Sequence, residues 1–404
     1  MRNGAGIARL KYPFSFPISV VKPIRLAVLG STGSIGRQTL DVVRSLPRRF
    51  NVIALAAGNN VTLLEEQVRE FRPRFIYAGG EADYLMARGS SGGVPVRWAE
   101  MEEMAAHPDV DLVIVATVGS AGLGPTLAAI RAGKSVALAN KEVLVMAGHI
   151  ITAEARRYNV ELRPIDSEHS AIWQCLWGEG RESVERITVT ASGGPFRDTP
   201  LHDLSRVTAD EALRHPNWQM GQKITVDTAT LLNKGLECIE ARWLFDVSLE
   251  KIDVLLHRES IVHSLVEFCD GSVKAQLGMP DMRLPIQCAL TYPERLRGTS
   301  VPRLDLRLIG TLNFGRPDTK QYPCLTLALE AGRRGGSCPA VLAAADEIAV
   351  QYFLAGHIRF TDIARIVSDA LNAHDQLANP SLDEVLQADD WARSYTEDWV
   401  KAKA

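Results

Sequence analysis

Residues 24–36 read Ile-Arg-Leu-Ala-Val-Leu-Gly-Ser-Thr-Gly-Ser-Ile-Gly, an apolar run that leads into three regularly spaced glycines. The run itself has the length and composition of a buried parallel strand. Gly30 would allow a sharp turn, Gly33 a close approach of backbone to a pyrophosphate, and Gly36 close packing of the helix that follows. The GxxGxxG spacing is looser than the usual fingerprint and also occurs in plain tight turns. Its place between a strand and a helix nevertheless favours a dinucleotide site.

The alternation of strand and helix continues along the chain. In chain order the predicted elements are helix 34–46, strand 51–57, a helix through 63–68, strand 111–117 and strand 135–139. Strands that alternate with helices over about 140 residues predict a doubly wound α/β domain. We assign this dinucleotide-binding domain to residues 24–166.

The pattern changes beyond about residue 160. Strands are predicted at 187–190 and 260–267, and a helix at 228–245, where apolar residues recur at three- and four-residue spacing. Together they predict a central α+β catalytic domain. The remaining predicted boundaries are a catalytic domain at 167–291, a proline-containing linker at 292–323 and a C-terminal helical domain at 324–404.

The first 23 residues stand apart from these domains. They hold four basic residues and no acidic one, and their apolar patch is short and contains Pro17. A targeting peptide is one interpretation. The other is an ordinary flexible extension or a start codon placed too early, and we predict the extension.

The composition narrows the classes of partner. The formal net charge is −3, which is not the charge of a nucleic-acid-binding chain. No uncharged apolar run approaches the roughly 18 residues that a membrane span needs. The six cysteines include no CxxC pair and fit a reducing compartment. We expect a cytoplasmic protein that binds neither nucleic acid nor a membrane.

Two short segments indicate a divalent metal. They are Asp166-Ser167-Glu168 and the run 233–237, Asn-Lys-Gly-Leu-Glu. On extended backbone, Asp166 and Glu168 would point the same way, and Glu237 would join them from a helix. Carboxylates alone suit Mg²⁺ or Mn²⁺ better than Zn²⁺. The alternative is a pair of solvated surface acids.

Neighbouring residues indicate an anion beside that metal. Ser192 precedes two glycines and could form part of a phosphate cradle, although a plain Gly-Pro turn is equally compatible. Thr228, Asn233 and Lys234 are predicted at a helix beginning, where they suit a phosphate; the alternative is ordinary capping by Thr228 or Asp227. The loop 215–221, His-Pro-Asn-Trp-Gln-Met-Gly, could close over a substrate as a lid, or its tryptophan could be a core anchor.

The end of the second strand bears on the cofactor. NAD sites usually carry an acidic residue there to bind the ribose hydroxyls. Residues 56–60 read Ala-Ala-Gly-Asn-Asn and contain no acid. This favours NADP, although the segment supplies no cation for a 2′-phosphate.

Taken together, these segments resemble the 1-deoxy-D-xylulose 5-phosphate reductoisomerase family. The resemblance runs from about residue 24 to the C-terminus. It rests on GSTGSIG at 30–36, ANKE at 139–142, DSEH at 166–169, SGGPF at 192–196, HPNWQMG at 215–221, VDTATLLNKGLE at 226–237 and GMPDMR at 278–283.

The resemblance implies roles for individual residues. It implies an NADPH site formed by Thr32, Gly33, Ser34, Ile35, Gly58, Asn59, Asn60, Asn140, Glu142 and Gly221. It implies that Mg²⁺ or Mn²⁺ is held by Asp166, Glu168 and Glu237. It implies sugar-phosphate contacts from Lys141, Ser167, Glu168, Ser192, His215, Trp218, Thr228, Asn233, Lys234 and Glu237. The implied catalytic residues are Lys141, Asp166, Glu168, Glu237 and His215, and Trp218 and Met220 belong to the implied lid.

The implied activity is the metal-dependent isomerisation and NADPH-dependent reduction of 1-deoxy-D-xylulose 5-phosphate to 2-C-methyl-D-erythritol 4-phosphate. This is a step of non-mevalonate isoprenoid precursor biosynthesis, and the family implies a homodimer. One rival is an NADP-dependent reductase of another phosphorylated aldehyde or ketose without rearrangement. Another is a non-catalytic dinucleotide sensor, against which the presence of all three carboxylates counts.

The chain departs from the family pattern at a few positions. Asn59 stands where a lysine is common, Thr228 where a serine is usual, and Asp346 where an asparagine is usual. Arg258 and Glu259 replace a common Pro-Gln pair. None of these removes a predicted metal ligand, so an active enzyme is expected.

Overall fold

The computed structural model describes residues 22–79, 96–218, 220–297 and 301–403. Its larger sheet is entirely parallel, with strand order β4-β3-β2-β1-β5-β6-β7. The strands are β1 (Ile24–Leu29), β2 (Phe50–Ala57), β3 (Phe75–Ala78), β4 (Arg97–Trp98), β5 (Leu112–Val115), β6 (Ser135–Leu138) and β7 (Leu162–Pro164). The order reverses next to β1, so a crevice forms at the carboxyl ends of β1 and β5.

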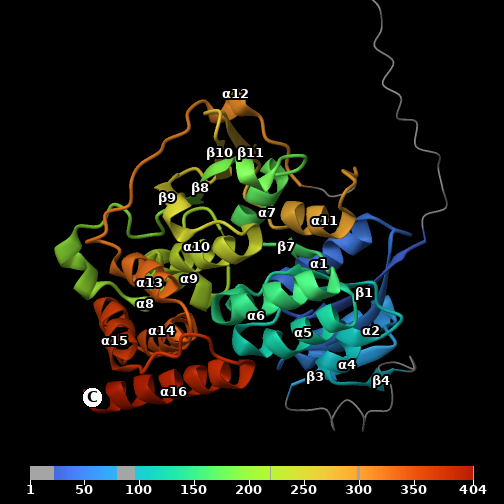
Figure 1. The fold of residues 1–404 in the computed structure, drawn as a ribbon, viewed down its shortest axis with the longest axis horizontal. Helices are drawn as coiled ribbons and strands as arrows, with labels where there is room; N and C mark the ends of the chain where they lie inside the picture. The colour runs from blue at the N-terminus through green and yellow to red at the C-terminus, as the bar shows by residue number, and fades with distance from the viewer. Residues whose placement is uncertain (1–21, 80–95, 219, 298–300, 404) are drawn as a thin grey trace, which may run out of the picture.

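Both faces of this sheet are covered by helices (Figure 1). Alternate residues of β1 enter different apolar clusters: Leu26 packs with α1 and α2, and Ala27 packs with α4, α5 and α6. A parallel strand that is apolar on both faces is what such a layered sheet requires. The helices are α1 (Ser34–Ser45), α2 (Val61–Phe71), α4 (Met101–Ala106), α5 (Leu123–Arg131) and α6 (Glu142–Tyr158).

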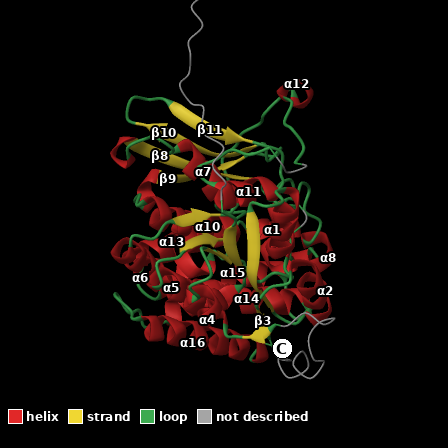
Figure 2. Cartoon of the chain, turned by 90° about the vertical axis from the view of Figure 1, so that its right-hand side faces the viewer, coloured by secondary structure: helices red, strands yellow, loops and turns green. Residues whose placement is uncertain are grey.

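A second sheet of four strands has the order β11-β10-β8-β9. β8 pairs in parallel with β9 and antiparallel with β10, so the sheet is mixed. Figure 2 shows it as a layer at the end of the molecule opposite α16. The strands of this sheet and the helices of the same part of the chain are α7 (Ser167–Cys175), β8 (Val184–Ala191), α8 (Ala209–Ala212), α9 (Gln222–Thr230), α10 (Leu232–Phe245), β9 (Ile252–Leu256), β10 (Val262–Phe268), β11 (Val273–Leu277) and α11 (Arg283–Thr291).

The C-terminal part is helical. Its elements are α12 (Leu306–Ile309), α13 (Pro323–Arg334), α14 (Cys338–Leu354), α15 (Phe360–Ala373) and α16 (Leu382–Lys401). α14 is apolar almost all round and packs against α15, α16, α6 and α9. A helix of that composition must be covered on every side. The C-terminal helices therefore form a backing for the elements that carry the site.

The predicted fold class is confirmed: a doubly wound parallel sheet, a mixed α+β part and C-terminal helices. One predicted element is wrong, because the helix expected at 228–245 is two helices. Leu231 has φ +56°, a left-handed conformation that ends α9 and begins α10. The apolar spacing runs through this break without a change, so periodicity could not reveal it.

Other predictions meet the structure only in part. The proposed linker includes α12, and Gly315 pairs with Leu256 of β9. The domain boundaries stay predictions. Apart from residues 22 and 23, the predicted N-terminal extension lies outside the described residues. Within the described part of the chain, no helix has the length and apolar character that a membrane crossing requires.

The third glycine of the turn gives a test of the fold. A Cβ on Gly36 would overlap the Gly30 carbonyl oxygen and the Ser31 backbone, far inside van der Waals contact. We expect Gly36→Ala to lower the free energy of unfolding by about 1–3 kcal/mol, because α1 must move away from β1. Urea unfolding measures this.

Gly33→Ala is the matched control. Its Cβ would lie 3.3 Å from the Gly30 carbonyl oxygen, with φ at −71°, so little strain is expected. Equal stability of the two variants would contradict the packing role of Gly36.

Candidate active site

A cavity of about 950 Å³ opens between the parallel sheet and the mixed sheet. Elements of both contribute to its wall: the start of α1, the start of α6, α7, the end of β8, the loop 215–221, α9 and α10. Among the predicted site residues, those that line it are Ser34, Ile35, Lys141, Asp166, Ser167, Glu168, Ser192, His215, Trp218, Gly221, Thr228, Asn233, Lys234 and Glu237. The residues predicted to bind the metal, the substrate and part of the nucleotide thus line one cavity.

The three predicted metal ligands converge. Ligand oxygens of Asp166, Glu168 and Glu237 all lie within 4.8 Å of one another. The prediction that Asp166 and Glu168 share one extended segment is wrong, because Glu168 lies in a helix. Asp166 is the N-cap of α7, where its Oδ1 accepts the Ser167 N–H at 2.8 Å, and Glu168 lies in the first turn. The cap and the first helical turn, rather than a strand, bring these carboxylates together.

Two buried lysines partly offset the charge of this acidic cluster. Lys141 Nζ lies 3.0 Å from Asp166 Oδ2 and 3.4 Å from Glu237 Oε1. Lys234 Nζ lies 2.5 Å from Glu168 Oε1 and 2.8 Å from Glu237 Oε2. Both lysines are less than a tenth exposed, so their charges are screened little by solvent. The carboxylates are thus held together by cations in a nearly dry site.

The pKa shifts follow from this arrangement. Burial and the negative charges of Glu168 and Asp166 raise the pKa of Glu237 to about 8, against the opposing effect of the lysines. Burial also acts to raise the pKa of Asp166, but the charges of Lys141, His169 and Lys234 outweigh it and lower that pKa. Glu237 is therefore the ligand whose charge depends most on a nearby cation.

The residues fit a hard divalent cation. Asp166 Oδ2 is buried and has no aligned hydrogen-bond donor among the described residues, although Lys141 lies at ion-pair distance from it. Carboxylate oxygens from two separate helices can surround one ion. Mg²⁺ and Mn²⁺ prefer such oxygen ligands to nitrogen or sulfur ligands. The alternative, that Asp166 and Glu168 are solvated surface acids, is wrong, because their side chains are 16% and 13% exposed and each is paired with a buried lysine.

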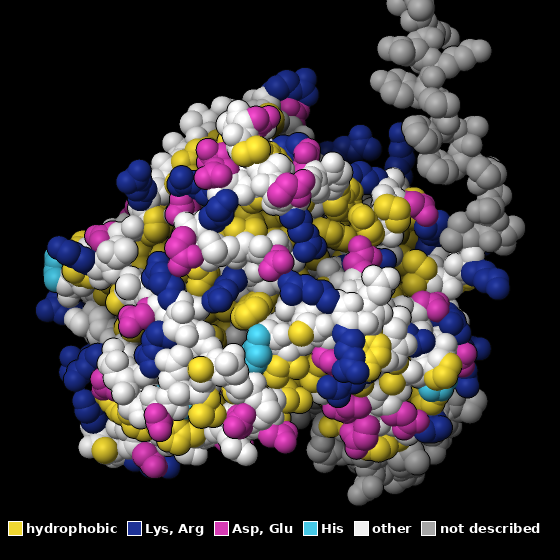
Figure 3. All heavy atoms as spheres, viewed as in Figure 1, with side chains coloured by type: hydrophobic (Ala, Val, Ile, Leu, Met, Phe, Trp, Pro, Cys, Tyr) yellow, Lys and Arg dark blue, Asp and Glu magenta, His cyan; other side chains and the backbone are white. Residues whose placement is uncertain are grey.

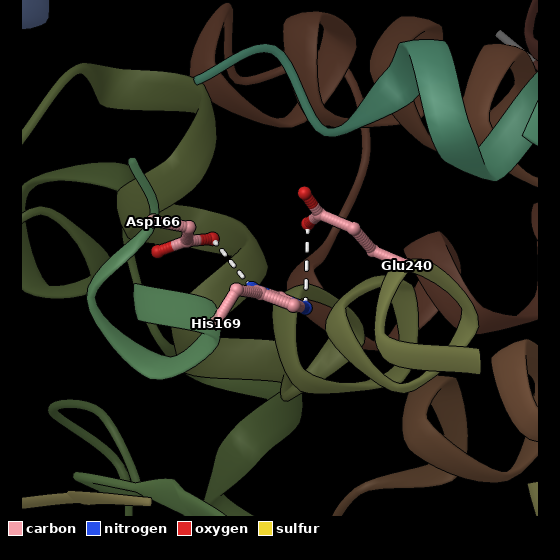
Figure 4. Close-up of side chains that lie close together, drawn as sticks. All are labelled: Asp166, His169 and Glu240. Carbon is pink, nitrogen blue, oxygen red and sulfur yellow. Dashed lines mark ion pairs between the residues drawn. The ribbon is translucent and has the colours of Figure 1, made fainter. Parts of the chain in front are cut away.

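Behind these ligands lies a group that the sequence reasoning missed, shown in Figure 4. The His169 ring stands between two carboxylates, with Nδ1 3.8 Å from Asp166 Oδ2 and Nε2 3.5 Å from Glu240 Oε2. Nε2 also lies 2.9 Å from the Glu237 carbonyl oxygen. One ligand atom from each of the three side chains lies within 4.8 Å of the others, but the closest contacts use opposite ring nitrogens, so His169 bridges the two carboxylates. The group thus supports Asp166 and α10 from behind.

The residues predicted to bind a phosphate also lie close together. Ser192 directly follows β8, and positive φ angles at Gly193 and Gly194 turn the chain towards α9. A Cβ on Gly194 would lie 2.9 Å from Ala229 Cα. Thr228 lies in the last turn of α9, not at a helix beginning as predicted. Asn233 and Lys234 lie in the first turn of α10, as predicted. The capping alternative fails for Asp227, whose side chain binds Lys223 inside α9.

His215 connects the lid loop to this region. Its Nδ1 accepts the backbone N–H groups of Asn217 at 3.1 Å and Trp218 at 2.9 Å, and its Nε2 lies 2.9 Å from Ser192 Oγ. A nitrogen that accepts two N–H groups carries no proton, so the neutral ring has its proton on Nε2 and donates to Ser192. Burial and the charges of Lys234 and Arg197 lower the pKa of His215 to about 4.

The rest of the lid loop is anchored at a second point. The Asn217 side chain donates to the Arg258 carbonyl oxygen at 2.6 Å and to Ser260 Oγ at 2.9 Å. Trp218 lines the cavity half-buried and does not enter an apolar core cluster, so the core-anchor interpretation fails. Gln219 lies outside the described residues.

The predicted nucleotide residues form a strip along the carboxyl ends of the parallel strands. Thr32 and Gly33 lie in the loop after β1, and Gly58, Asn59 and Asn60 follow the adjacent strand β2. These five do not line the cavity, and neither do Asn140 and Glu142 at the start of α6. The Asn60 side chain caps α2 by accepting the Leu63 N–H at 3.1 Å. Such an elongated strip suits a dinucleotide whose reactive end enters the cavity.

Several lining residues carried no clear sequence signal. His257, Ser260 and His263 line the cavity from β10 and the loop before it, and Met282 from the segment before α11. The motif at 278–283 could have indicated Met282. A lone histidine on a strand is a weak signal, and no spacing connected His263 to the other site residues.

Comparison with known proteins agrees with this site. Family models match residues 26–148 (1-deoxy-D-xylulose 5-phosphate reductoisomerase), 162–245 (the C-terminal domain of the same enzyme) and 277–395 (DXP reductoisomerase C-terminal domain). A reductoisomerase of that name from Pelotomaculum thermopropionicum is 53% identical over 374 residues, 91% of this chain and 96% of the relative. One from Heliobacterium modesticaldum is 54% identical over 382 residues, which cover 93% of this chain and 97% of the relative.

Solved structures agree as well. A DOX-P reductoisomerase in complex with NADPH, fosmidomycin and magnesium superposes with a TM-score of 0.87 at 40% identity, covering 94% of this chain and 98% of that one. The Zymomonas mobilis enzyme in complex with NADPH gives a TM-score of 0.86 at 42% identity, covering 94% of this chain and 99% of that one. By its matched segments, its relatives and its fold, this chain belongs to the 1-deoxy-D-xylulose 5-phosphate reductoisomerase family.

Proposed function

We propose that this chain converts 1-deoxy-D-xylulose 5-phosphate into 2-C-methyl-D-erythritol 4-phosphate, by a metal-dependent rearrangement followed by reduction with NADPH. The observation that carries the proposal is the meeting of three carboxylates with hydroxyl, amide and ammonium groups in one cavity beside a nucleotide turn. Related structures bind NADPH, magnesium and fosmidomycin. The product belongs to isoprenoid precursor biosynthesis.

Asp166, Glu168 and Glu237 would hold Mg²⁺ or Mn²⁺. When bound, the ion would polarise the ketone and hydroxyl oxygens of the substrate, and NADPH would supply the hydride. Lys141 contacts Asp166, Glu237 and Asn233 and so keeps the acidic cluster in place. Because the site is largely buried, these fixed charges act strongly on a bound substrate.

The phosphate end would be bound by Ser192, Thr228, Asn233 and Lys234. His215 donates from Nε2 to Ser192 Oγ, which leaves the serine O–H free to donate to a phosphate oxygen. Trp218 and Met220 would close over the substrate and exclude water. Anchoring at this end keeps fragments of the rearrangement from leaving the site.

The NADPH side would be formed by Thr32, Gly33, Ser34 and Ile35 at the pyrophosphate, and by Gly58, Asn59 and Asn60 at the adenosine. The N-terminus of α1 points its free N–H groups toward this turn. Asn140, Glu142 and Gly221 would also contact the cofactor.

We also propose a cytoplasmic homodimer. All six cysteines are unpaired, which suits a reducing compartment. Leu306 and Leu308 of α12 are 52% and 85% exposed, and Val273 of edge strand β11 is 55% exposed, so apolar surface is available for self-association. On the face drawn in Figure 3, basic and acidic side chains are interspersed. Sedimentation velocity tests the dimer.

The activity is tested by following the absorbance of reduced nicotinamide with 1-deoxy-D-xylulose 5-phosphate, with and without Mg²⁺ or Mn²⁺. Metal-dependent oxidation of NADPH supports rearrangement followed by reduction. Oxidation with the rearranged aldehyde but not with the ketose would favour the simple reductase instead. No oxidation by a folded protein that binds NADPH would favour the sensor.

The metal assignment predicts the effect of Glu237→Gln. The amide fills the same space but offers no negative charge, so we expect Mn²⁺ affinity to fall at least about tenfold. Titration with Mn²⁺ followed by electron paramagnetic resonance measures it. Glu185→Gln, on the exposed end of β8, is the control. Unchanged Mn²⁺ affinity in Glu237→Gln would show that the three-carboxylate site is wrong.

The His215 contacts predict a pH response. With a folded pKa of about 4, His215 stays neutral where a free histidine titrates, near pH 6.5. The unfolded chain then takes up the proton first, so this residue's contribution to stability is present above pH 6.5 and is lost as the pH falls towards 4. Nitrogen-15 NMR should find Nε2–H at neutral pH. A ring that is protonated at pH 6 would contradict the contacts.

Asn59 predicts a change in cofactor preference. The segment 56–60 has no cation for a 2′-phosphate, and Asn59 is exposed. We expect Asn59→Lys to tighten NADPH binding several-fold and to leave NADH binding unchanged, because only NADPH offers the extra charge. Fluorescence titration with both nucleotides tests this. Equal changes for NADPH and NADH would place Asn59 away from the 2′-phosphate.

A further inference from the structure

A second charge cluster, of two buried carboxylates and a lysine whose side chain is 28% exposed, lies on the other side of the helix that carries Thr228. Lys223 and Asp227 are one turn apart on α9, and Asp346 lies on α14, which packs against α9 (Figure 1). Lys223 Nζ lies 2.6 Å from Asp227 Oδ2 and 2.9 Å from Asp346 Oδ2. Asp227 is 2% exposed and Asp346 is fully buried. Nothing in the proposed reaction uses these groups.

The charges of this cluster do not balance when both carboxylates are ionised. One ammonium then faces two carboxylates, and buried net charge is costly. Asp227 Oδ1 and both oxygens of Asp346 also have no aligned hydrogen-bond donor among the described residues. Both carboxyl groups contact the same Lys223 Nζ, so they lie side by side, and a hydrogen bond between them would satisfy these unpartnered oxygens. A carboxyl group can donate such a bond only when it is protonated.

The helix α9 lies between this cluster and the cavity, with one face lining the cavity and another facing α14. Ile224 and Thr228, four residues apart, line the cavity. Lys223 and Asp227, also four residues apart, face α14. Side chains at this spacing share a face of a helix. A shift of α9 along or around its axis would therefore move Thr228 and Gly221 at once.

We propose that Asp227 and Asp346 share one proton, and that the resulting neutral cluster with Lys223 fixes α9 on α14 and so positions Thr228 in the cavity. Asp346 is then a positioning residue: it touches no substrate and acts through α9. The part of this inference that concerns the cavity rests on the proposed function. The shared proton does not.

The surroundings support the shared proton. Burial and the neighbouring carboxylate of Asp346 raise the pKa of Asp227 well above its ordinary value, and Lys223 only partly opposes this. The other titratable groups that act on the cluster are Glu142 of α6, on Lys223, and Cys324 of α13, beside both carboxylates. Burial raises the pKa of the Cys324 thiol, so it stays neutral and adds no charge.

The pH dependence has a definite sign. Between the ordinary pKa of an aspartate, about 4, and the raised folded value, the folded chain holds one proton more than the unfolded chain. Stability from this pair is therefore complete below about pH 4 and is lost as the pH rises through the folded pKa. Asp346→Asn supplies the hydrogen-bond donor permanently and removes the extra proton.

The first experiment compares urea unfolding of the whole chain and three variants between pH 5 and 9. Relative to Asp346→Asn, the wild-type ratio of folded to unfolded molecules should fall about tenfold for each pH unit until the shared proton is lost. Relative to Asp227→Asn, the wild-type ratio should fall with the same slope, because an amide at either position removes the shared proton. Parallel pH profiles for wild type and Asp346→Asn would overturn the shared proton.

The double variant Asp227→Asn/Asp346→Asn is the matched control. It leaves Lys223 without a carboxylate from either helix, so it should be less stable than both single variants at every pH. A double variant as stable as the singles would overturn the fixing of α9 by this cluster. The outcome depends on no substrate, so it remains decisive if the proposed reaction is wrong.

The second experiment tests positioning. At alkaline pH the KM for 1-deoxy-D-xylulose 5-phosphate should rise several-fold in the wild type and stay flat in Asp346→Asn, with both proteins fully folded. A purely structural role would leave the two KM profiles parallel, and that result would overturn the positioning of Thr228. No turnover by either protein would count against the proposed function and leave the unfolding result to decide the shared proton.

Discussion

Three carboxylates have to stay together in a place where water is largely excluded, and most of this architecture serves that need. Asp166, Glu168 and Glu237 repel one another, and the repulsion is strong because the surroundings are buried. Lys141 and Lys234 offset it from two sides. Each lysine comes from the start of a different helix, so the charge balance requires α6, α7 and α10 to meet at one point. Packing of the C-terminal helices makes that meeting possible.

The closeness of that packing explains an otherwise costly glycine inside α10. Glycine in a helix interior lowers stability relative to alanine by about 1 kcal/mol. A Cβ on Gly235 would collide with the side chain of Ala328 on α13. The glycine therefore lets α13 lie directly against the helix that carries Lys234 and Glu237. The C-terminal helices therefore affect the site by how closely they pack against α10, and they contribute no predicted ligand.

Local signals in the sequence were strong enough to predict much of this structure. The apolar run 24–30 and its glycines indicated the parallel sheet and its crevice, because a strand buried on both faces has a recognisable composition. The segments 166–168 and 233–237 indicated the carboxylate cluster, since hard-metal ligands and phosphate donors rarely occur together by chance. What failed was geometry within a turn: the cap at Asp166 and the break at Leu231 leave no trace in apolar spacing.

Other parts of the site could not be predicted because they depend on contacts between distant elements. Glu240 reads as one more charged residue on a helix, and only the fold places it against His169. The anchoring of Asn217 uses the backbone carbonyl of Arg258, an atom that every residue type supplies. A hydrogen bond to backbone leaves no preference for the residue type at that position. Sequence patterns are silent about such contacts for that reason.

The lid loop and α9 are continuous in the chain, and this continuity links the events at the cavity. His215 holds the start of the loop to Ser192 and to its own backbone, and Gly221 ends the loop as the N-cap of α9. In the proposed lid closure, the loop would move between a fixed histidine and a fixed helix. The mouth of the cavity would then change while Thr228 and Ser192 keep their places. Phosphate-binding groups that stay fixed beside a closing loop would suit the proposed reaction, whose fragments must not escape.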